Sequence, residues 1–299
     1  MLSGNIMLRD IGNISLIKIG VIGAGRLGRA LAWCLATHGF DIHAAASRTE
    51  EEARTLASRT RRCLVVSPQH VADTCDLIFI TTPDDSIAPT ANSIKWRSGT
   101  GVVHCSGATD VSALSKAASD GAWIGGFHPL QTFGDPTAAA LTLPGCVVTI
   151  EASDELNDAL SAIARRLGCK INLLPPGARG SYHAAAAYAG QFLNVLLAEA
   201  VRVWKSWGGT EEAALQALLP LMRGTVSSIE TAGIARGMPG PVSRGDIGTV
   251  RKHLKSLSTV DEPAASFYRE LAVRSVPLAR EAGAISQETA AEIMQILRN

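Results

Sequence analysis

The sequence predicts an α/β domain built on a parallel sheet, followed by an all-α carboxyl-terminal domain. Apolar, strand-like segments alternate with helical segments from Leu16 to about Leu174. Such alternation is typical of a parallel sheet whose strands are joined by helical crossovers. After the breaker cluster at 175–177 (Pro-Pro-Gly), helical periodicity replaces the alternation almost completely. The chain is therefore expected to change architecture at that point.

The individual elements follow from this pattern. Eight short apolar runs have the length of buried strands, and they lie at 16–23, 40–48, 63–66, 77–81, 101–105, 123–127, 146–150 and 170–174. In the carboxyl-terminal half, helices are expected at 181–206, 210–222, 225–235, 247–257, 262–281 and 286–297. We predict the first of these to be one long helix, whose many alanines permit close approach of neighbouring helices.

A glycine-rich turn directly follows the first strand and opens a helix. The segment 23–28 reads GAGRLG, the G-x-G-x-x-G pattern of a dinucleotide-phosphate site. Gly23 supplies the tight turn, Gly25 lets the backbone approach a pyrophosphate, and Gly28 lets the helix pack near the strand. The helix amino terminus also favours an anion. This context predicts a Rossmann-type domain that binds its cofactor through Gly23, Gly25, Arg26, Leu27 and Gly28; the alternative is that the glycines serve only tight packing.

The end of the second strand distinguishes between cofactors. An acidic residue there hydrogen-bonds the ribose 2′-hydroxyl of NAD and repels the 2′-phosphate of NADP. Here the strand ends with Ser47, Arg48 and Thr49, and the next carboxylate in the chain is Glu50. Arg48 can form a bidentate contact with a phosphate, and the two hydroxyls can donate to it. We therefore predict NADP(H) rather than NAD(H), although Arg48 could also be a solvated surface arginine.

The loop after the fourth strand lies at the carboxyl edge of the predicted sheet, where doubly wound folds bind ligands. Thr82 and Pro83 are the candidates there for contact with the nicotinamide side of the cofactor. The two acidic residues that follow, Asp84 and Asp85, could equally cap the next helix.

Length and composition restrict the possible classes of protein. At about 100–200 residues per domain, 299 residues suggest two domains. We expect a flexible extension at 1–15, a dinucleotide-binding domain at 16–176 and a helical substrate-binding and dimerisation domain at 177–299. Apolar residues make up 46% of the chain, charged residues 18%, and the net charge is +1. This composition lacks the basic footprint of a nucleic-acid-binding or membrane-surface protein.

Location and assembly are also predicted. The longest apolar stretches are short or interrupted, so no membrane span is expected. The six cysteines are far apart and form no C-x-x-C pair, which favours free thiols in a reducing cytoplasm over disulfides or a metal site. The helical half contains few large apolar residues for its length, so we expect a homodimer.

Three polar clusters are candidates for chemistry, and they read HCSG at 104–107, GFHPLQT at 126–132, and YH at 182–183 together with GPVSRGD at 240–246 and His253. Reduction of a carbonyl or imine needs a proton donor and a group that holds the substrate. Histidine suits the donor role because its pKa lies near 6.5, and His128 and His183 are the candidates. Arg244 is the candidate carboxylate clamp. Each histidine could instead be structural, and Asp246 could simply cap a helix.

These motifs resemble one known family. The segments VIGAGRLG, ASRT, HCSGATD, GGFHPLQTF, YHAAAAYAG and GPVSRGD, with His253, are similar to Rossmann-like proteins that carry a DUF2520 domain, from about Leu16 to the end of the chain. The family belongs with 6-phosphogluconate dehydrogenase, pyrroline-5-carboxylate reductase, prephenate dehydrogenase and ketopantoate reductase. The resemblance implies an NADP-dependent oxidoreductase, and some members are thought to act as an alternative ketopantoate reductase.

The sequence departs from the broader group in the helix that follows the Rossmann domain. In the broader group, the helix after the Rossmann domain brings a catalytic lysine or asparagine to the nicotinamide. The corresponding helix here has no lysine near His183, and Gln191 stands where an asparagine is expected. We therefore favour a histidine as the acid and take Ser106, Gln131, Gln191, Arg244 and His253 as the substrate-binding candidates.

Three functions remain open at this point. The first is an NADPH-dependent reductase of a small carboxylate-bearing 2-oxo acid such as ketopantoate. The second is a cyclic imine reductase or a prephenate-type dehydrogenase. The third is a catalytically silent NADP-binding sensor. An enzyme would bring His128, His183, Arg244 and His253 into one pocket.

Overall fold

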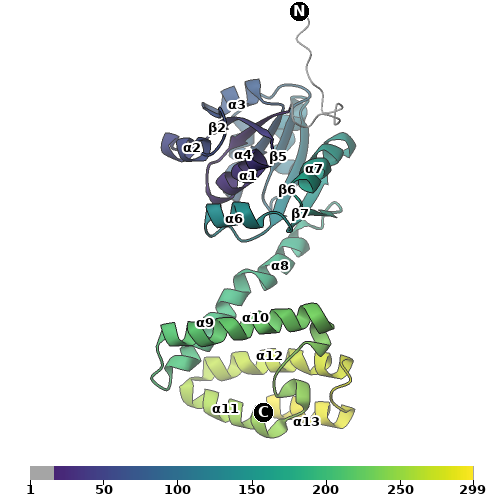
Figure 1. Cartoon of the computed structure of the whole chain (residues 1–299). Helices are drawn as coiled ribbons and strands as arrows, with labels where there is room; N and C mark the ends of the chain where they lie inside the picture. Colours follow the sequence, from purple (N-terminus) through teal and green to yellow (C-terminus); the bar gives the residue numbers. More distant parts are fainter. Residues whose placement is uncertain (1–16, 299) are drawn as a thin grey trace, which may run out of the picture. The chain divides into compact units, whose positions relative to one another are not determined.

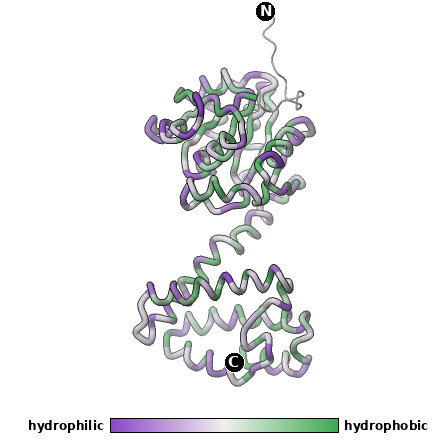
Figure 2. The backbone as a smooth tube through the Cα atoms, viewed as in Figure 1, coloured by the Kyte–Doolittle hydropathy of each residue, from purple (hydrophilic) through white to green (hydrophobic). Residues whose placement is uncertain are grey.

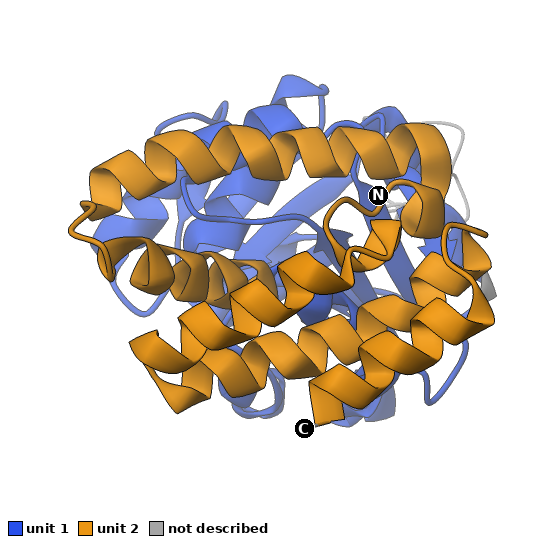
Figure 3. Cartoon of the chain, turned by 90° about the horizontal axis from the view of Figure 1, so that it is seen from below, with its two compact units in different colours: residues 1–190 blue, residues 191–299 orange. Residues whose placement is uncertain are grey.

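A computed structural model describes residues 17–298, apart from the side chain of Asp154. The chain divides into two compact units, residues 1–190 and residues 191–299, which Figure 3 shows in different colours. The first unit holds all the described strands, and the described part of the second is helical. This confirms the predicted fold class. The extension expected at 1–15 lies outside the described residues.

The first unit, shown with its covering helices in Figure 1, is built on an eight-stranded sheet with the order β3-β2-β1-β4-β5-β6-β7-β8. Each of the eight predicted runs overlaps one strand, although β6 and β7 extend past their predicted ends at 127 and 150: β1 (Lys18–Ile22), β2 (Asp41–Ala46), β3 (Leu64–Val65), β4 (Leu77–Ile80), β5 (Gly101–His104), β6 (Trp123–Leu130), β7 (Val147–Ala152) and β8 (Lys170–Leu173). The first six strands are parallel, in the order typical of a Rossmann domain.

The seventh strand departs from the parallel pattern. β7 runs antiparallel to β6, with Leu130 opposite Val147, and β8 is again parallel to β7. The reversal arises because the short helix α6 (Pro136–Thr142) packs against α1 (Arg26–Thr37) and does not carry the chain back to the start of β6. The chain therefore enters β7 at the edge where β6 ends.

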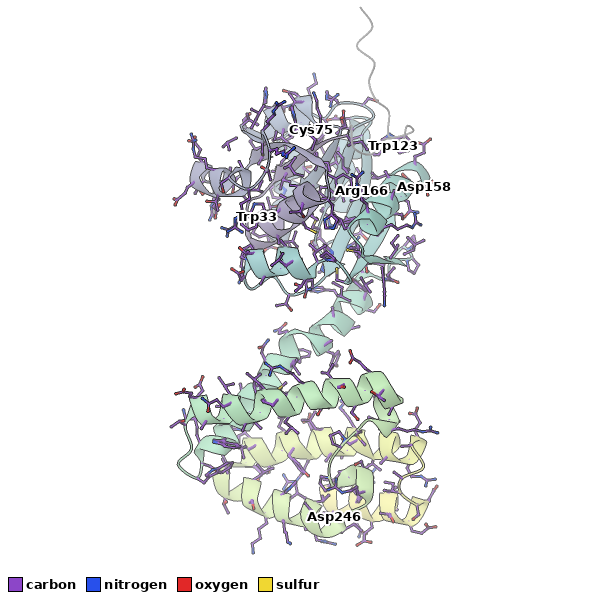
Figure 4. The ribbon with its side chains drawn as sticks, viewed as in Figure 1. Trp33, Cys75, Trp123, Asp158, Arg166 and Asp246 are labelled. Carbon is purple, nitrogen blue, oxygen red and sulfur yellow. The ribbon has the colours of Figure 1, made fainter. Side chains whose placement is uncertain are left out.

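Helices cover both faces of this sheet and bury two apolar cores. One core contains residues of α1, α2 (Glu50–Ala57) and α7 (Asp154–Arg166). The other contains residues of α3 (Pro68–Thr74), α4 (Asp84–Asn92), the 3₁₀ helix η2 (Val111–Leu114) and α5 (Ser115–Ser119). Trp33 of α1, labelled in Figure 4, donates its indole N–H to the carbonyl of Leu56 at 2.9 Å and so holds α2 against α1.

A helical stretch spans the division between the units. The helix predicted at 181–206 is two helices, α8 (Arg179–Ala189) and α9 (Gln191–Lys205), because Gly190 has non-helical dihedral angles (φ −107°, ψ −82°). The units divide at this glycine, whereas the boundary predicted at 176/177 lies before α8. By length and composition alone, 179–205 is apolar enough to cross a membrane. One such stretch is weak evidence for a membrane protein. Figure 2 shows that apolar and polar residues are interspersed along the helices of both units.

The second unit consists of α9, α10 (Glu211–Arg236), η3 (Val242–Arg244), α11 (Ile247–Val260), α12 (Glu262–Glu281) and α13 (Gln287–Arg298). The two helices expected at 210–222 and 225–235 form the single element α10, which is interrupted only at Gly233. Asp246 caps α11 by accepting the backbone N–H of Thr249 at 3.0 Å, and it is labelled in Figure 4. The core of this unit lies between α11, α12 and α13.

Candidate active site

The three glycines of the turn have three different environments. Gly23 has a φ of +111°, a left-handed conformation that favours glycine. A Cβ on Gly28 would lie 2.1 Å from the carbonyl oxygen of Gly23, whereas a Cβ on Gly25 would meet no atom within 4 Å. Thr81 donates its hydroxyl to the same Gly23 carbonyl and joins β4 to the turn. The turn is therefore rigid at Gly23 and Gly28 and open at Gly25.

A cleft of about 470 Å³ opens at this edge of the first unit, and it is lined by Gly25, Arg26, Leu27, Thr81, Thr82, Pro83, Asp84, Cys105, Ser106, Thr132, Phe133 and Gly134. Six of the predicted site residues are among them. The hydroxyl oxygen of Thr82 is buried there and has no hydrogen-bond partner within residues 17–298. An open turn at a helix amino terminus and an unpaired hydroxyl fit a dinucleotide phosphate and its nicotinamide end.

A carboxylate of α2, Glu52, lies beside the end of β2, and no sequence pattern had indicated it. Ser47 donates its hydroxyl to Glu52 at 2.8 Å, and its oxygen lies 3.4 Å from the backbone nitrogen of Ala24. Hydrogen bonds from Ser47 and Thr49 lower the pKa of Glu52, and the charge of Arg48 adds to this effect. Glu52 is therefore ionised beside the hydroxyls expected to receive a 2′-phosphate. It escaped notice because it reaches Ser47 from the first turns of α2.

A buried arginine lies over three residues that are paired across neighbouring strands of the sheet. His104, Gly126 and Glu151 are paired in register across β5, β6 and β7. Arg179 of α8 is only 4% exposed, and its Nη2 lies 2.0 Å from where a Cβ on Gly126 would be. A side chain at this position would therefore displace the guanidinium.

The same guanidinium connects three segments of the first unit. Its Nε donates to Glu151 at 2.5 Å, and its Nη1 donates to the carbonyl of Ser106 at 2.8 Å. Arg179 thus holds α8, β7 and the turn after β5 together. Within the described chain, its Nη2 and the Nε2 of His104 are buried and have no partner.

The two predicted histidines lie together beside this arginine. The ring centroids of His128 and His183 are 6.2 Å apart. A Cβ on Gly107 would meet both rings, at 2.8 Å from His128 Cε1 and 2.6 Å from His183 Cδ2. The phenol oxygen of Tyr182 lies 2.7 Å from Nδ1 of His128. Since Ser106 lines the cleft, the histidines lie directly beyond one of its walls.

Burial determines the charge of His104 and His128. It lowers the pKa of His128 to about 4, and the charges of His183 and Arg179 act in the same direction. Burial, followed by the charge of Arg179, lowers the pKa of His104 to about 4 as well. Both imidazoles are therefore neutral near pH 7. His128 can act there as an N–H donor, but not as the cationic acid that a pKa near 6.5 would allow.

Other predicted residues have different surroundings. The amide of Gln131 donates to the carbonyl of Thr142 at 3.1 Å and so ties down the loop after β6. Gln191, Arg244 and His253 belong to the second unit. Arg244 is exposed in η3, and Nδ1 of His253 lies 3.0 Å from the phenol oxygen of Tyr268. Contact of these residues with a substrate stays a prediction.

Sequence reasoning did not assign site roles to Arg179, Tyr182 or Glu151. Arg179 follows the breaker cluster within the segment PPGAR, and an arginine among small and breaker residues was the signal used to select Arg244. Tyr182 directly precedes His183 in the same motif. Glu151 had no local signal, because its partner is 28 residues away.

All six cysteines of the chain are free thiols, and the two sulfurs of Cys146 and Cys169 are 3.9 Å apart. Among residues 17–298, no group of His, Cys, Asp or Glu side chains is arranged to hold a metal ion.

The fold and the cleft define a protein with a Rossmann-type domain and a separate helical unit. Two family models match the sequence: a Rossmann-like domain at residues 8–129 and DUF2520, a domain of unknown function, at 146–275. The chain therefore belongs to the proteins that join a Rossmann-like domain to a DUF2520 domain, as its motifs predicted. A comparison with curated proteins gave no match.

Solved structures with this fold include several oxidoreductases. A candidate NADP oxidoreductase from Bacteroides fragilis is 26% identical, with a TM-score of 0.71, covering 88% of this chain and 99% of that one. A protein from Thermotoga maritima is 23% identical, with a TM-score of 0.72 and coverages of 88% and 98%. A reductive aminase from Aspergillus terreus, solved with NADPH, is 15% identical, with a TM-score of 0.57 and coverages of 94% and 92%.

The environments of the glycines predict opposite effects of two similar substitutions. Gly28→Ala should lower the free energy of unfolding by about 1–3 kcal/mol, because its Cβ would clash with backbone atoms. Gly25→Ala should change stability by less than about 0.5 kcal/mol but weaken binding of a nicotinamide dinucleotide, since its methyl group would lie where the phosphate approaches. Urea unfolding and a fluorescence titration measure the two effects. Equal loss of stability in both variants would contradict this account.

The buried histidines predict loss of stability in acid. Their folded-state pKa values of about 4 lie below the value of 6.5 expected in the unfolded chain, so the unfolded state binds protons first as the pH falls. Stability should be greatest above pH 6.5 and decrease down to about pH 4, by roughly 1 kcal/mol per pH unit for each histidine. Urea unfolding should show a shallower decrease for His128→Gln and an unchanged one for His70→Gln, a surface control.

Proposed function

We propose that this protein is an NADPH-dependent oxidoreductase that reduces a small carboxylate-bearing 2-oxo acid, ketopantoate-like, by hydride transfer. One observation carries the proposal: a neutral histidine N–H donor lies beside the wall of a cleft that suits a dinucleotide. Ser106 lines the cleft, and the next residue, Gly107, lies against the rings of His128 and His183. Arg244, an exposed residue of η3, stays our candidate for recognising a carboxylate.

The residues around His128 suit proton delivery to a developing alkoxide. NADPH, when bound, supplies the hydride. His128 donates its Nε2 proton to the substrate oxygen while its Nδ1 receives the phenolic proton of Tyr182, which lies 2.7 Å away. The imidazole thus changes tautomer without becoming a cation or an anion. Burial raises the pKa of Tyr182 above its usual value of 10, so its proton is present at neutral pH, and the phenolate regains one from solvent.

The choice of NADP(H) over NAD(H) is supported by the end of β2. Arg48 is exposed there beside the hydroxyls of Ser47 and Thr49, and the similar Bacteroides fragilis protein is described as a candidate NADP oxidoreductase. Glu52 opposes this preference, because its charge would repel a 2′-phosphate. We propose that Glu52 releases Ser47 when the phosphate binds.

The remaining proposals concern organisation. We assign cofactor binding to 16–176 and substrate binding and dimerisation to 177–299. Large apolar side chains are exposed on α9 and α10, among them Leu193, Leu221 and Ile234. A second copy that covers these helices would form a homodimer, which we propose to work in the cytoplasm.

A substrate screen tests the function. NADPH oxidation should be fastest with a branched 2-oxo acid such as ketopantoate, and His128→Phe should lower kcat about 10²–10⁴-fold with little change in NADPH affinity. His70→Phe, at an exposed position of α3, should leave kcat unchanged. If only cyclic imines are turned over, the substrate is an imine and not a 2-oxo acid. If NADPH binds but no substrate is turned over, the protein is a sensor.

Cofactor preference is tested at α2 and the turn before it. Arg48→Ala should weaken NADPH binding about 10–100-fold with little effect on NADH, because a charge-assisted contact contributes about 1.5–3 kcal/mol. Glu52→Gln should strengthen NADPH binding, since a repulsive charge is removed. Glu51→Gln, at an exposed neighbouring position, is the matched control. Isothermal titration measures all three, and an unchanged NADPH/NADH ratio in Arg48→Ala would exclude the assignment.

A further inference from the structure

Two cysteine sulfurs lie side by side at the start of neighbouring strands. Cys146 directly precedes β7 and Cys169 directly precedes β8, and the two strands are paired in parallel with Val147 opposite Lys170. The backbone nitrogen of Lys170 donates to the carbonyl of Cys146 at 2.8 Å, which continues the pairing as far as the cysteines. Their Sγ atoms are 3.9 Å apart. The two thiols are therefore neighbours across the edge of the sheet.

This placement suits a disulfide bond. Residues opposite each other on paired strands lie about 4.7–4.9 Å apart, within the separation of about 4.4–6.8 Å that the two Cα atoms of a disulfide have. Their side chains also project from the same face of the sheet. To form the bond, the sulfurs must approach from 3.9 Å to about 2 Å, which side-chain rotation can supply while the strands stay paired. The fold therefore already holds the two thiols within bonding reach.

The two thiols differ in access and acidity. Cys146 is half-buried and follows the exposed residues Pro144 and Gly145, whereas Cys169 is buried. The S–H of Cys169 has two acceptors in reach, the carbonyl of Leu143 at 3.3 Å and the sulfur of Cys146. Donation to that sulfur stabilises the thiolate and lowers the pKa of Cys146. Cys146 is thus the nucleophile that solvent reaches, and Cys169 is the thiol behind it.

The other four cysteines have the opposite character. Burial raises the pKa of Cys34 to about 11 and that of Cys75 to about 12, and it also raises the pKa values of Cys63 and Cys105. Thiols of this kind stay protonated near pH 7, and a protonated thiol is a poor nucleophile. Oxidation of the chain should therefore begin at Cys146.

We propose that Cys146 and Cys169 form a redox-active pair, in which a hydroperoxide oxidises Cys146 and Cys169 converts the product into a disulfide. The Cys146 thiolate attacks one peroxide oxygen: an S–O bond forms, the O–O bond breaks, and the released hydroxide or alkoxide takes up a proton. The sulfur of Cys169 then attacks the sulfur of this sulfenic acid. The S–S bond forms, the S–O bond breaks, and the hydroxide leaves with the thiol proton as water. Each disulfide uses one hydroperoxide, which takes two electrons from the sulfurs.

This modification site is separate from the reductase chemistry. Neither cysteine lines the cleft, so the inference does not depend on the proposed function. The alternative is that both sulfurs only fill space in the apolar core, as free cysteines often do. Peroxide would then oxidise an accessible thiol singly, without joining two of them. A half-buried thiol with a second sulfur in bonding reach favours the redox pair.

The test is peroxide treatment of the full, reduced chain, followed by thiol alkylation and peptide mass spectrometry. Near pH 7.5, one equivalent of hydrogen peroxide should remove two of the six free thiols and join the peptides that contain Cys146 and Cys169, and dithiothreitol should restore both thiols. Cys169→Ser should stop at a sulfenic acid on Cys146 that dimedone traps. Cys146→Ser should slow the loss of thiols at least about tenfold. Cys63→Ser, at the other half-buried cysteine, is the matched control and should form the same disulfide.

The proposal is wrong if the wild type accumulates sulfenic or sulfinic acid at Cys146 without a disulfide, or if the bond joins a different pair such as Cys34 and Cys146. Equal rates of thiol loss in the wild type and Cys146→Ser would also contradict it. The cross-link in the wild type needs no substitution, so the test holds even if a serine variant does not fold.

Discussion

The arrangement of the candidate site depends on one buried cation. Arg179 is almost completely enclosed, and a buried charge is stable only when it is paired and hydrogen-bonded. Glu151 supplies the opposite charge, the carbonyl of Ser106 accepts a second hydrogen bond, and Gly126 leaves the space. Each of these partners comes from a different segment of the first unit. Removing the carboxylate of Glu151 would leave the buried charge without its partner, and a side chain at position 126 would displace the guanidinium.

The antiparallel direction of β7 makes the ion pair between Arg179 and Glu151 possible. Glu151 lies opposite Gly126 because β7 is antiparallel to β6, and the same register places Thr149 opposite His128. The reversed strand therefore places Glu151 where Arg179 of α8 can pair with it. Burial and the charge of Arg179 lower the pKa values of His104 and His128, so both imidazoles are neutral near pH 7. A neutral imidazole in contact with the hydroxyl of Tyr182 can donate a hydrogen bond but cannot act as a cationic acid.

Much of the first unit could be predicted from local patterns. The strands β1 to β8 were each marked by an apolar run, and the distinct roles of Gly23, Gly25 and Gly28 follow from a motif of six consecutive residues. His128 and His183 were each selected as candidate acids from their motifs, and the structure places their ring centroids 6.2 Å apart. These features depend on neighbours in the sequence or on a recurrent supersecondary unit.

The features that were missed depend on contacts between distant segments. The direction of β7 is set by the packing of α6 on α1, which an apolar run does not reveal. Glu52 reaches Ser47 only after α2 has formed, and Glu151 meets Arg179 across the sheet. The break at Gly190 was hidden because a single glycine is tolerated within a helical pattern. Long-range partners of this kind determine charge states, and charge states determine the mechanism.

The most direct test of the account is the pH dependence of the hydride-transfer step. Single-turnover oxidation of bound NADPH by the best 2-oxo acid should be measured from pH 5 to pH 8 by the loss of nicotinamide absorbance. A neutral His128 with a folded-state pKa of about 4 predicts a rate that is nearly constant over this range. A rate that falls as the pH rises through about 6.5 would show that a cationic histidine is the acid, and it would contradict the central claim.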